Sequence, residues 1–355
     1  MCSIRMNNRI SNVLVGVLRS LLSTKSSEQN LPFAARKYIS WSLKIGVSLA
    51  AVLYIFQRLE THQTSLTSLF AASSALSIAN LAGLILAGVM CVTTNWGIEM
   101  YKWNMLIGDK LDVFWRTAVK GVLTGTTFGV FTPNRSGEFI GRTLALGPEQ
   151  RVTGIVLSII NGLAQSMATL TFGVIGFIYL LETFALESIG SIGAVVIQFM
   201  LLALWIVSLF LFFRMDVAIK MMRGISFLRR YSNSIERASG LSHQLLNKLY
   251  LLSLLRFATF VIQYGIVFSL LFDSPNWVEI AGLSMVTLFS STILSVIPIP
   301  DVFIKEAVAL SYFSLFHFDL GLVATGVLAV WLINIALPAL LGAVILFTYR
   351  IFKTV

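Results

Sequence analysis

The sequence predicts an all-α polytopic membrane protein with six full transmembrane helices and two re-entrant helical hairpins. Hydrophobic residues make up 57% of the 355 residues and charged residues only 12%, and the mean hydropathy is +0.85. A soluble domain of this length cannot bury so much apolar surface. Charge-poor runs of about 20 residues, enough to cross the hydrocarbon core, recur along the chain. Proline-containing breaks end two of these runs, at 128–142 and 295–310.

Uncharged runs locate the predicted spans. Four runs without internal charge are the clearest: those between Glu60 and Glu99, between Arg151 and Glu182, between Glu187 and Arg214, and between Asp319 and Arg350. Two more, 39–56 and 249–272, contain one base each, Lys44 and Arg256. Two further runs, 115–133 and 277–300, end in the prolines of the two breaks. Whether these last two cross the membrane or turn back decides the topology.

Lysine and arginine collect at two places, an N-terminal segment 1–37 and a loop 214–248. Because cytoplasmic loops carry the excess of bases, we expect both on the cytoplasmic side, the first as a cytoplasmic or interfacial segment. Arg350 and Lys353 put the C-terminus on the same side. The turns 182–187 and 273–279 contain acids and no base, which suits the outer side. We therefore expect a multi-pass protein of the plasma (inner) membrane with both termini cytoplasmic.

The charge bias favours re-entrant hairpins at the two breaks. If all eight runs crossed, the basic loop 214–248 would lie outside and the acidic turn at Glu182 inside. If the runs 115–133 and 277–300 turn back from opposite faces, every assignment fits. The halves 38–183 and 184–355 then each contain three crossings and one hairpin in opposite orientation, as in an inverted repeat. The alternative keeps 134–150 as an ordinary loop after a full third span.

The first break, FGVFTPNRSGEFIGR, concentrates charge directly after an apolar run. Pro133 ends a helix because it lacks an amide donor, and Gly137 permits close backbone approach. Glu138 and Arg142, spaced i and i+4, share a helical face and can pair. Arg135, on the turn, offers a planar fork suited to phosphate. We predict a substrate-binding role for these residues, with structural salt bridges as the alternative.

The second break has the same character. Two prolines are followed by three ionisable residues at helical spacing, which are Pro298, Pro300, Asp301, Lys305 and Glu306. Ionisable residues within a membrane bundle are functional candidates, and Arg256 in its span is another. The alternatives for these residues are a structural salt bridge or a base that snorkels to the headgroups.

No cofactor or metal site is predicted. The two cysteines, Cys2 and Cys91, match no metal spacing and cannot form a disulfide framework. The three histidines, His62, His243 and His317, are scattered in expected loops or span ends. The net charge of +10 lies mainly at the predicted cytoplasmic edges, so it indicates topology and not nucleic-acid binding.

Four segments of the chain together carry a resemblance to a known family. They are the Pro133, Arg135, Gly137, Glu138 and Arg142 pattern, NWGIEMYKWNML at 95–106, RFATFVIQ at 256–263, and the break at 300–306. Over residues 38–350 the chain resembles the lysylphosphatidylglycerol synthase transmembrane-region family, also called flippase-like. The resemblance implies movement or handling of a lipid. One departure is that Asp301 and Val302 stand where family members usually have glycines, which bears on close backbone approach and substrate preference.

Because the sequence does not supply the family's soluble aminoacyl-transfer domain, we do not expect lysylation. We predict a stand-alone flippase-like protein that moves a phospholipid or prenyl-phosphate-linked lipid between leaflets. The alternatives are a membrane-embedded transferase with Glu138 or Asp301 as general base, and a scaffold for a separately encoded lipid-modifying enzyme bound through 214–248. The expected partners are anionic or phosphate-bearing lipids. The sequence leaves the lipid, the direction of transport and the oligomeric state open.

Overall fold

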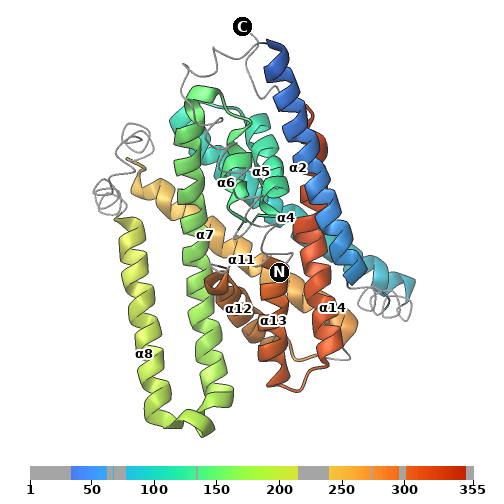
Figure 1. Cartoon of the computed structure of the whole chain (residues 1–355). Helices are drawn as coiled ribbons and strands as arrows, with labels where there is room; N and C mark the ends of the chain where they lie inside the picture. The colour runs from blue at the N-terminus through green and yellow to red at the C-terminus, as the bar shows by residue number, and fades with distance from the viewer. Residues whose placement is uncertain are drawn as a thin grey trace, which may run out of the picture.

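The computed structural model describes residues 33–61, 67, 77–132, 135–214, 240–272, 275–295 and 301–348 (Figure 1). The described residues form helices and their connections, without strands. Five helices are long and apolar enough to cross a membrane: Pro148–Thr183, Ile192–Phe213, His243–Leu271, Trp277–Leu294 and Leu320–Leu346. Trp41–Gln57 is a shorter apolar helix. These findings agree with the predicted class, an all-α multi-pass membrane protein.

Most helices coincide with the predicted runs. In chain order the elements are α2 (Phe33–Thr61), α4 (Ile78–Leu111), α5 (Trp115–Gly129), α6 (Gly137–Thr143), η2 (Pro148–Gln150), α7 (Arg151–Leu180), η3 (Leu181–Ala185), α8 (Leu186–Phe213), α11 (His243–Leu271), α12 (Trp277–Leu294), α13 (Asp301–Ser314), α14 (Leu320–Trp331), η5 (Leu332–Ala336) and α15 (Leu337–Leu346). The apolar runs thus predict the positions of most of these helices, and α4 is the exception.

Helix α4 corrects the prediction. We placed a span between Glu60 and Glu99 and treated Glu99 as its end. The helix instead begins at Ile78 and continues through Glu99 to Leu111. Asn95, Glu99 and Lys102, spaced i, i+4 and i+7, share one helical face, and all three are buried. An uncharged run ends at the first charged residue, so it does not reveal a span whose internal charges have partners on other helices.

Helices α7 and α8 form a long antiparallel hairpin that meets at its lower end in Figure 1. The predicted acidic turn at 182–187 stays helical, because a π-helical turn, η3, leads directly into α8. Within the apolar stretch Ile192–Phe213, only 6% of the most apolar 18-residue window is buried. A helix that is hydrophobic all round and so little covered is suited to contact with lipid.

The connection after α8 lies mostly outside the described residues, as do the segment 1–32 and the residues Cys2 and His62. Of the predicted basic loop 214–248, residues 215–239 are not described. Its last part belongs to α11, which begins at His243 and is capped by the Ser242 hydroxyl, acceptor of a hydrogen bond from the Leu245 amide. Lys248 is therefore a helix residue and not a loop residue.

Helices α5 and α6 pack closely through glycines. A Cβ atom added to Gly141 would lie 2.7 Å from the Gly125 Cα, and one added to Gly137 would lie 2.4 Å from the Phe128 carbonyl oxygen. Small residues allow membrane helices to approach in this way. The close backbone approach predicted at Gly137 is therefore observed, and the spacing of Gly121, Gly125 and Gly129 on α5 extends the same contact surface.

Helices α14 and α15 form one rod interrupted by the π-helical turn η5. Pro338 gives the reason, since it has no amide donor and its ring meets the carbonyl four residues earlier, that of Asn334. On α15, a Cβ atom added to Gly342 would lie 2.0 Å from the Leu123 carbonyl oxygen. The Thr127 hydroxyl donates to the Ala339 carbonyl at 2.7 Å. The second half of the chain thereby holds α5 in place.

Helices α12 and α13 pack together through Ile280, Leu283, Ala309 and Phe313, in a cluster with α11 and α14. In Figure 1 the α12–α13 pair lies in the lower part of the molecule, and the α5–α6 pair lies in the upper part. The two helix pairs therefore lie in different parts of the bundle.

We predict that Gly141→Ala lowers the thermal stability of the purified protein in detergent. The new methyl group forces α5 and α6 apart, and overpacking of this kind costs about 1–3 kcal/mol. The melting temperature should fall by a few degrees. Gly108→Ala in α4 is the matched control, because a Cβ atom there meets nothing within 4 Å. Equal melting temperatures for the two variants would contradict the glycine contact.

Candidate functional site

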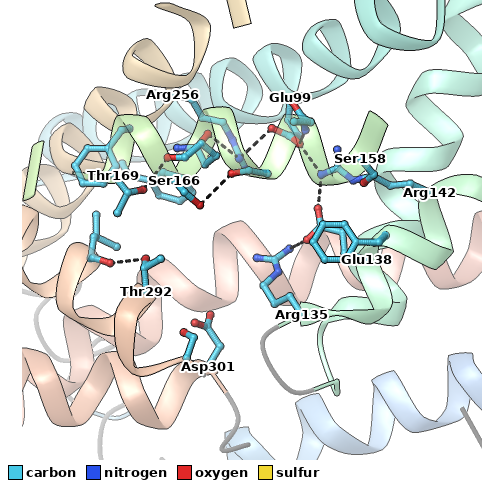
Figure 2. A pocket seen from close by; sticks show the side chains of 18 of the residues that line it. Glu99, Arg135, Glu138, Arg142, Ser158, Ser166, Thr169, Arg256, Thr292 and Asp301 are labelled. Atoms are coloured by element: carbon cyan, nitrogen blue, oxygen red, sulfur yellow. Dashed lines mark hydrogen bonds and ion pairs between the residues drawn. The ribbon is translucent and has the colours of Figure 1, made fainter. Parts of the chain in front are cut away.

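A cavity of about 260 Å³ lies where the two broken segments come together (Figure 2). Its walls come from α4, α6, α7, α11, α12 and α13, together with Arg135 just before α6. Six of the residues predicted from the sequence line it: Arg135, Glu138, Arg142, Arg256, Asp301 and Lys305. The fold thus brings the charges of both breaks and of the α11 span to one place.

The other predicted site residues lie elsewhere. Gly137 is buried beneath α5 and contacts backbone, so it positions α6 and does not face the cavity. Glu306 is half-buried on α13 and is not among the residues that line the cavity. Pro133, Pro298 and Pro300 lie outside the described residues.

Glu99 is the centre of the charged cluster, and the sequence prediction missed it. Its Oε1 lies 2.5 Å from Arg142 Nη2, and its Oε2 lies 3.0 Å from Arg256 Nη1 and 3.5 Å from Lys102 Nζ. Asn161 Nδ2 donates to Oε1 at 2.7 Å. Because Glu99 is only 1% exposed, this carboxylate depends on these partners to remain charged in the interior. The shared helical face of Asn95, Glu99 and Lys102 was the signal that would have revealed it.

Glu138 joins Arg135 to Arg142. The predicted i, i+4 pair of Glu138 with Arg142 is present, and Glu138 Oε2 also lies 3.0 Å from Arg135 Nη2. Arg135 has a φ of 51°, a left-handed conformation that is uncommon for a side chain of this size. This backbone bend aims Arg135 back over α6 toward Glu138, as Figure 2 shows. The ion pairs that the alternative expects are therefore present, and the predicted role of these residues in binding stays a prediction.

A chain of amide side chains holds Arg256 in the interior. Arg256 Nε donates to Asn95 Oδ1 at 2.7 Å, and Arg256 Nη1 donates to Gln165 Oε1 at 3.3 Å. Asn95 Nδ2 then donates to Asn334 Oδ1 at 2.7 Å, and Asn334 Nδ2 donates to Gln263 Oε1 at 2.6 Å. Arg256 is thus fixed by hydrogen bonds and does not snorkel to a membrane edge. Asn334 reaches this chain from the π-helical turn η5.

Positive charge exceeds negative charge in this cluster. Four bases (Arg135, Arg142, Arg256 and Lys102) surround two acids (Glu99 and Glu138), which leaves a formal excess of two positive charges. Nε and Nη1 of Arg142 and Nε of Arg135 are buried without a hydrogen-bond partner among the described residues. Uncompensated charge is costly in an apolar bundle. An anion in the cavity would offset both the excess charge and the unused donors.

The second broken segment contributes a neutral pair. Lys305 Nζ lies 2.6 Å from Asp301 Oδ2, and both side chains are partly exposed to the cavity. Figure 2 shows Asp301 across the cavity from Glu99. The ion pair expected for Lys305 is therefore present, and it adds no net charge to the site.

Comparison with known proteins assigns no family. No protein-family model matches the chain, and no curated protein is similar to it. The resemblance to the flippase-like family therefore stays a prediction.

We predict that Glu99→Gln destabilises the protein strongly. Removing one partner from a buried ionic cluster costs about 3–5 kcal/mol, because Arg142, Arg256 and Lys102 lose their shared carboxylate. Thermal denaturation and the folded fraction on size-exclusion chromatography would measure the loss. Adding Lys102→Met should recover part of it, since one uncompensated charge is removed.

Glu182→Gln is the control for this series, because Glu182 is exposed in η3, directly after α7. That change should alter stability by less than about 0.5 kcal/mol. If Glu99→Gln were as stable as Glu182→Gln, Glu99 would not organise the cluster.

Proposed function

We propose that this protein moves a phosphate-bearing lipid, either a phospholipid or a prenyl-phosphate-linked lipid, between the leaflets of the plasma (inner) membrane. The observation that carries the proposal is the cavity inside an apolar helix bundle, lined by both broken segments and adjoining a charged cluster with a formal excess of two positive charges. A phosphate headgroup at that depth would meet guanidinium donors in place of water, while its tail stays in the bilayer.

We further propose six membrane crossings and two re-entrant hairpins, α5–α6 and α12–α13, in an inverted repeat. Helix lengths support part of this topology: α5 has 15 residues, α6 has 7 and α13 has 14, so even α5 spans only about 22 Å of a hydrocarbon core about 30 Å thick. Helix α12, with 18 residues, is long enough to cross, and its re-entrant placement rests on the bias of bases. Re-entrant backbone is tolerated where it lines a cavity, and the bias of bases puts both termini in the cytoplasm.

The acids of the cluster have a definite role in this proposal. Glu99 and Glu138 hold Arg135, Arg142 and Arg256 around the cavity, so the arginines are positioned before the lipid arrives. A phosphate that enters competes with the carboxylates for the same donors. Binding can then remain weak enough for the headgroup to leave on the other side.

The same ion pairs count against the transferase alternative. Both oxygens of Glu138 contact arginines, and Asp301 pairs with Lys305. A carboxylate whose oxygens already accept from cations has little capacity to take up a proton as a general base. Translocation without chemical change is therefore the function that this geometry favours.

The proposed topology predicts that cysteines at positions 114 and 147 react from the same side of the membrane. Phe114 and Gly147, both exposed, flank the α5–α6 pair. In vesicles, with Cys2 and Cys91 replaced, a membrane-impermeant maleimide should label Phe114→Cys and Gly147→Cys together. Glu182→Cys, at the other end of α7, should react from the opposite side. Labelling of positions 114 and 147 from opposite sides would establish a full third span.

The proposed function predicts that the purified protein in liposomes accelerates leaflet exchange of a phosphate-bearing lipid without altering it. Arg135→Lys keeps the charge and loses the planar fork, so exchange should slow about tenfold, the loss expected for one charge-assisted hydrogen bond. Arg116→Lys is the control, because Arg116 is exposed on α5 away from the cavity. A headgroup-quenching assay measures the rate. No acceleration for any lipid, with a new covalent product from a lipid donor, would favour the transferase.

A further inference from the structure

Helix α7 presents a neutral polar face to the cavity, next to the charged cluster. Five of its side chains line the cavity: Ser158, Asn161, Gln165, Ser166 and Thr169. Their spacing places them on one side of the helix, along about 16 Å of its length. Polar groups inside an apolar bundle are costly unless they are hydrogen-bonded. Asn161 and Gln165 are hydrogen-bonded to the charged cluster, whereas the hydroxyl groups of Ser166 and Thr169 have no partner in the cluster and still face the cavity.

The hydroxyl groups on this face of α7, called the hydroxyl wall below, can accept hydrogen bonds from the cavity. Ser166 Oγ donates to the Gly162 carbonyl at 3.1 Å, and Thr169 Oγ1 donates to the Gln165 carbonyl at 3.0 Å. A hydroxyl that gives its proton to its own helix still has lone pairs to offer. The wall therefore accepts hydrogen bonds from whatever fills the cavity.

Two features extend the acceptor surface. On α12, Thr292 and Ser295 also line the cavity and donate to carbonyls of their own helix, at 2.7 and 2.6 Å. Toward the charged cluster, the Asn161 amide nitrogen is engaged by Glu99. Asn161 Oδ1 is left buried and without a partner among the described residues, as is Ser158 Oγ. Figure 2 shows Ser166, Thr169 and Thr292 at one side of the cavity and Arg135, Glu138 and Arg142 at the other.

The two ends of the cavity therefore suit different groups. Arginines donate, and a phosphate only accepts, so phosphate fits the charged end. The hydroxyl wall accepts, so it fits groups that donate, and a bare phosphate has no such group. The volume of about 260 Å³ corresponds to roughly nine water molecules at ≈30 Å³ each, more than one phosphate fills. Phe139, Phe257 and Phe260 add flat apolar faces.

We infer that the lipid carried by this protein has a polyhydroxylated ring, of the size of one hexose or inositol, attached to its phosphate. The inference rests on the proposed function and specifies its substrate class. The phosphate binds at Arg135, Arg142 and Arg256. The ring hydroxyls donate to the Ser166 and Thr169 oxygens.

Leaflet exchange in liposomes tests the ring directly. The probes are phosphatidylinositol and a prenyl hexosyl phosphate, which contain the ring, and phosphatidate, which has the phosphate alone. Ring-containing lipids should exchange faster than phosphatidate. Thr169→Val and Ser166→Ala should each slow exchange of the ring-containing lipids about fivefold, the effect of one hydrogen bond, and leave phosphatidate exchange unchanged.

Thr259→Val is the matched control. Thr169 and Thr259 are buried to a similar extent, 7% and 6% exposed, and each donates to its own helix, at 3.0 and 2.9 Å. Thr259 does not line the cavity, so its replacement should affect no lipid. If only phosphatidylinositol exchanges, the substrate is a glycerolipid that carries the ring. If only the prenyl hexosyl phosphate exchanges, the substrate is a prenyl lipid that carries it.

Equal exchange of phosphatidate and the ring-containing lipids would overturn the inference and leave the proposed function standing. If no lipid exchanges, the proposed function fails. The ring site is then tested separately, by the increase in the melting temperature of the protein when soluble headgroups are added. Inositol 1-phosphate should then stabilise the protein more than inorganic phosphate, and Thr169→Val should remove the difference. Equal stabilisation by the two compounds would contradict the polyol site.

Discussion

A single buried carboxylate, Glu99, sets the relative positions of four helices. It lies on α4 and contacts Arg142 from α6, Asn161 from α7 and Arg256 from α11. Because a buried charge is tolerated only with its partners in place, these helices cannot shift independently. The glycine contact between α5 and α6 serves the same end, since a Cβ atom at Gly125 would lie 2.7 Å from the Arg142 side chain. Close packing there brings the arginine to the carboxylate.

The sequence predicts local features well and distant partnerships poorly. Apolar runs located α7 and α8 because a span is a local property of about 20 residues. The pairing of Glu138 with Arg142 followed from helical spacing. The role of Glu99 did not follow, because its partners Arg142 and Arg256 come from segments far along the chain. A charge inside a span looks like the end of the span until those partners are known.

The polar interior joins the two halves of the chain. Asn95 belongs to the first half and Asn334 and Gln263 to the second, and their amides form one hydrogen-bonded series that ends at Arg256. At the far end of the series, Gln263 Nε2 is buried without a hydrogen-bond partner among the described residues. The cavity is therefore built from both halves at once, and its charged and neutral ends are held in a common frame.

The π-helical turn η5 has a geometric consequence for the rod formed by α14 and α15. One extra residue in a turn advances the helical phase by about 100°, so the two parts can present different sides. Val323 and Val327 on α14 pack with Phe268 and Phe313. Leu346 on α15 packs with Phe128 instead. A single straight helix would have to compromise between these two surfaces, whereas the phase step lets one rod fit both.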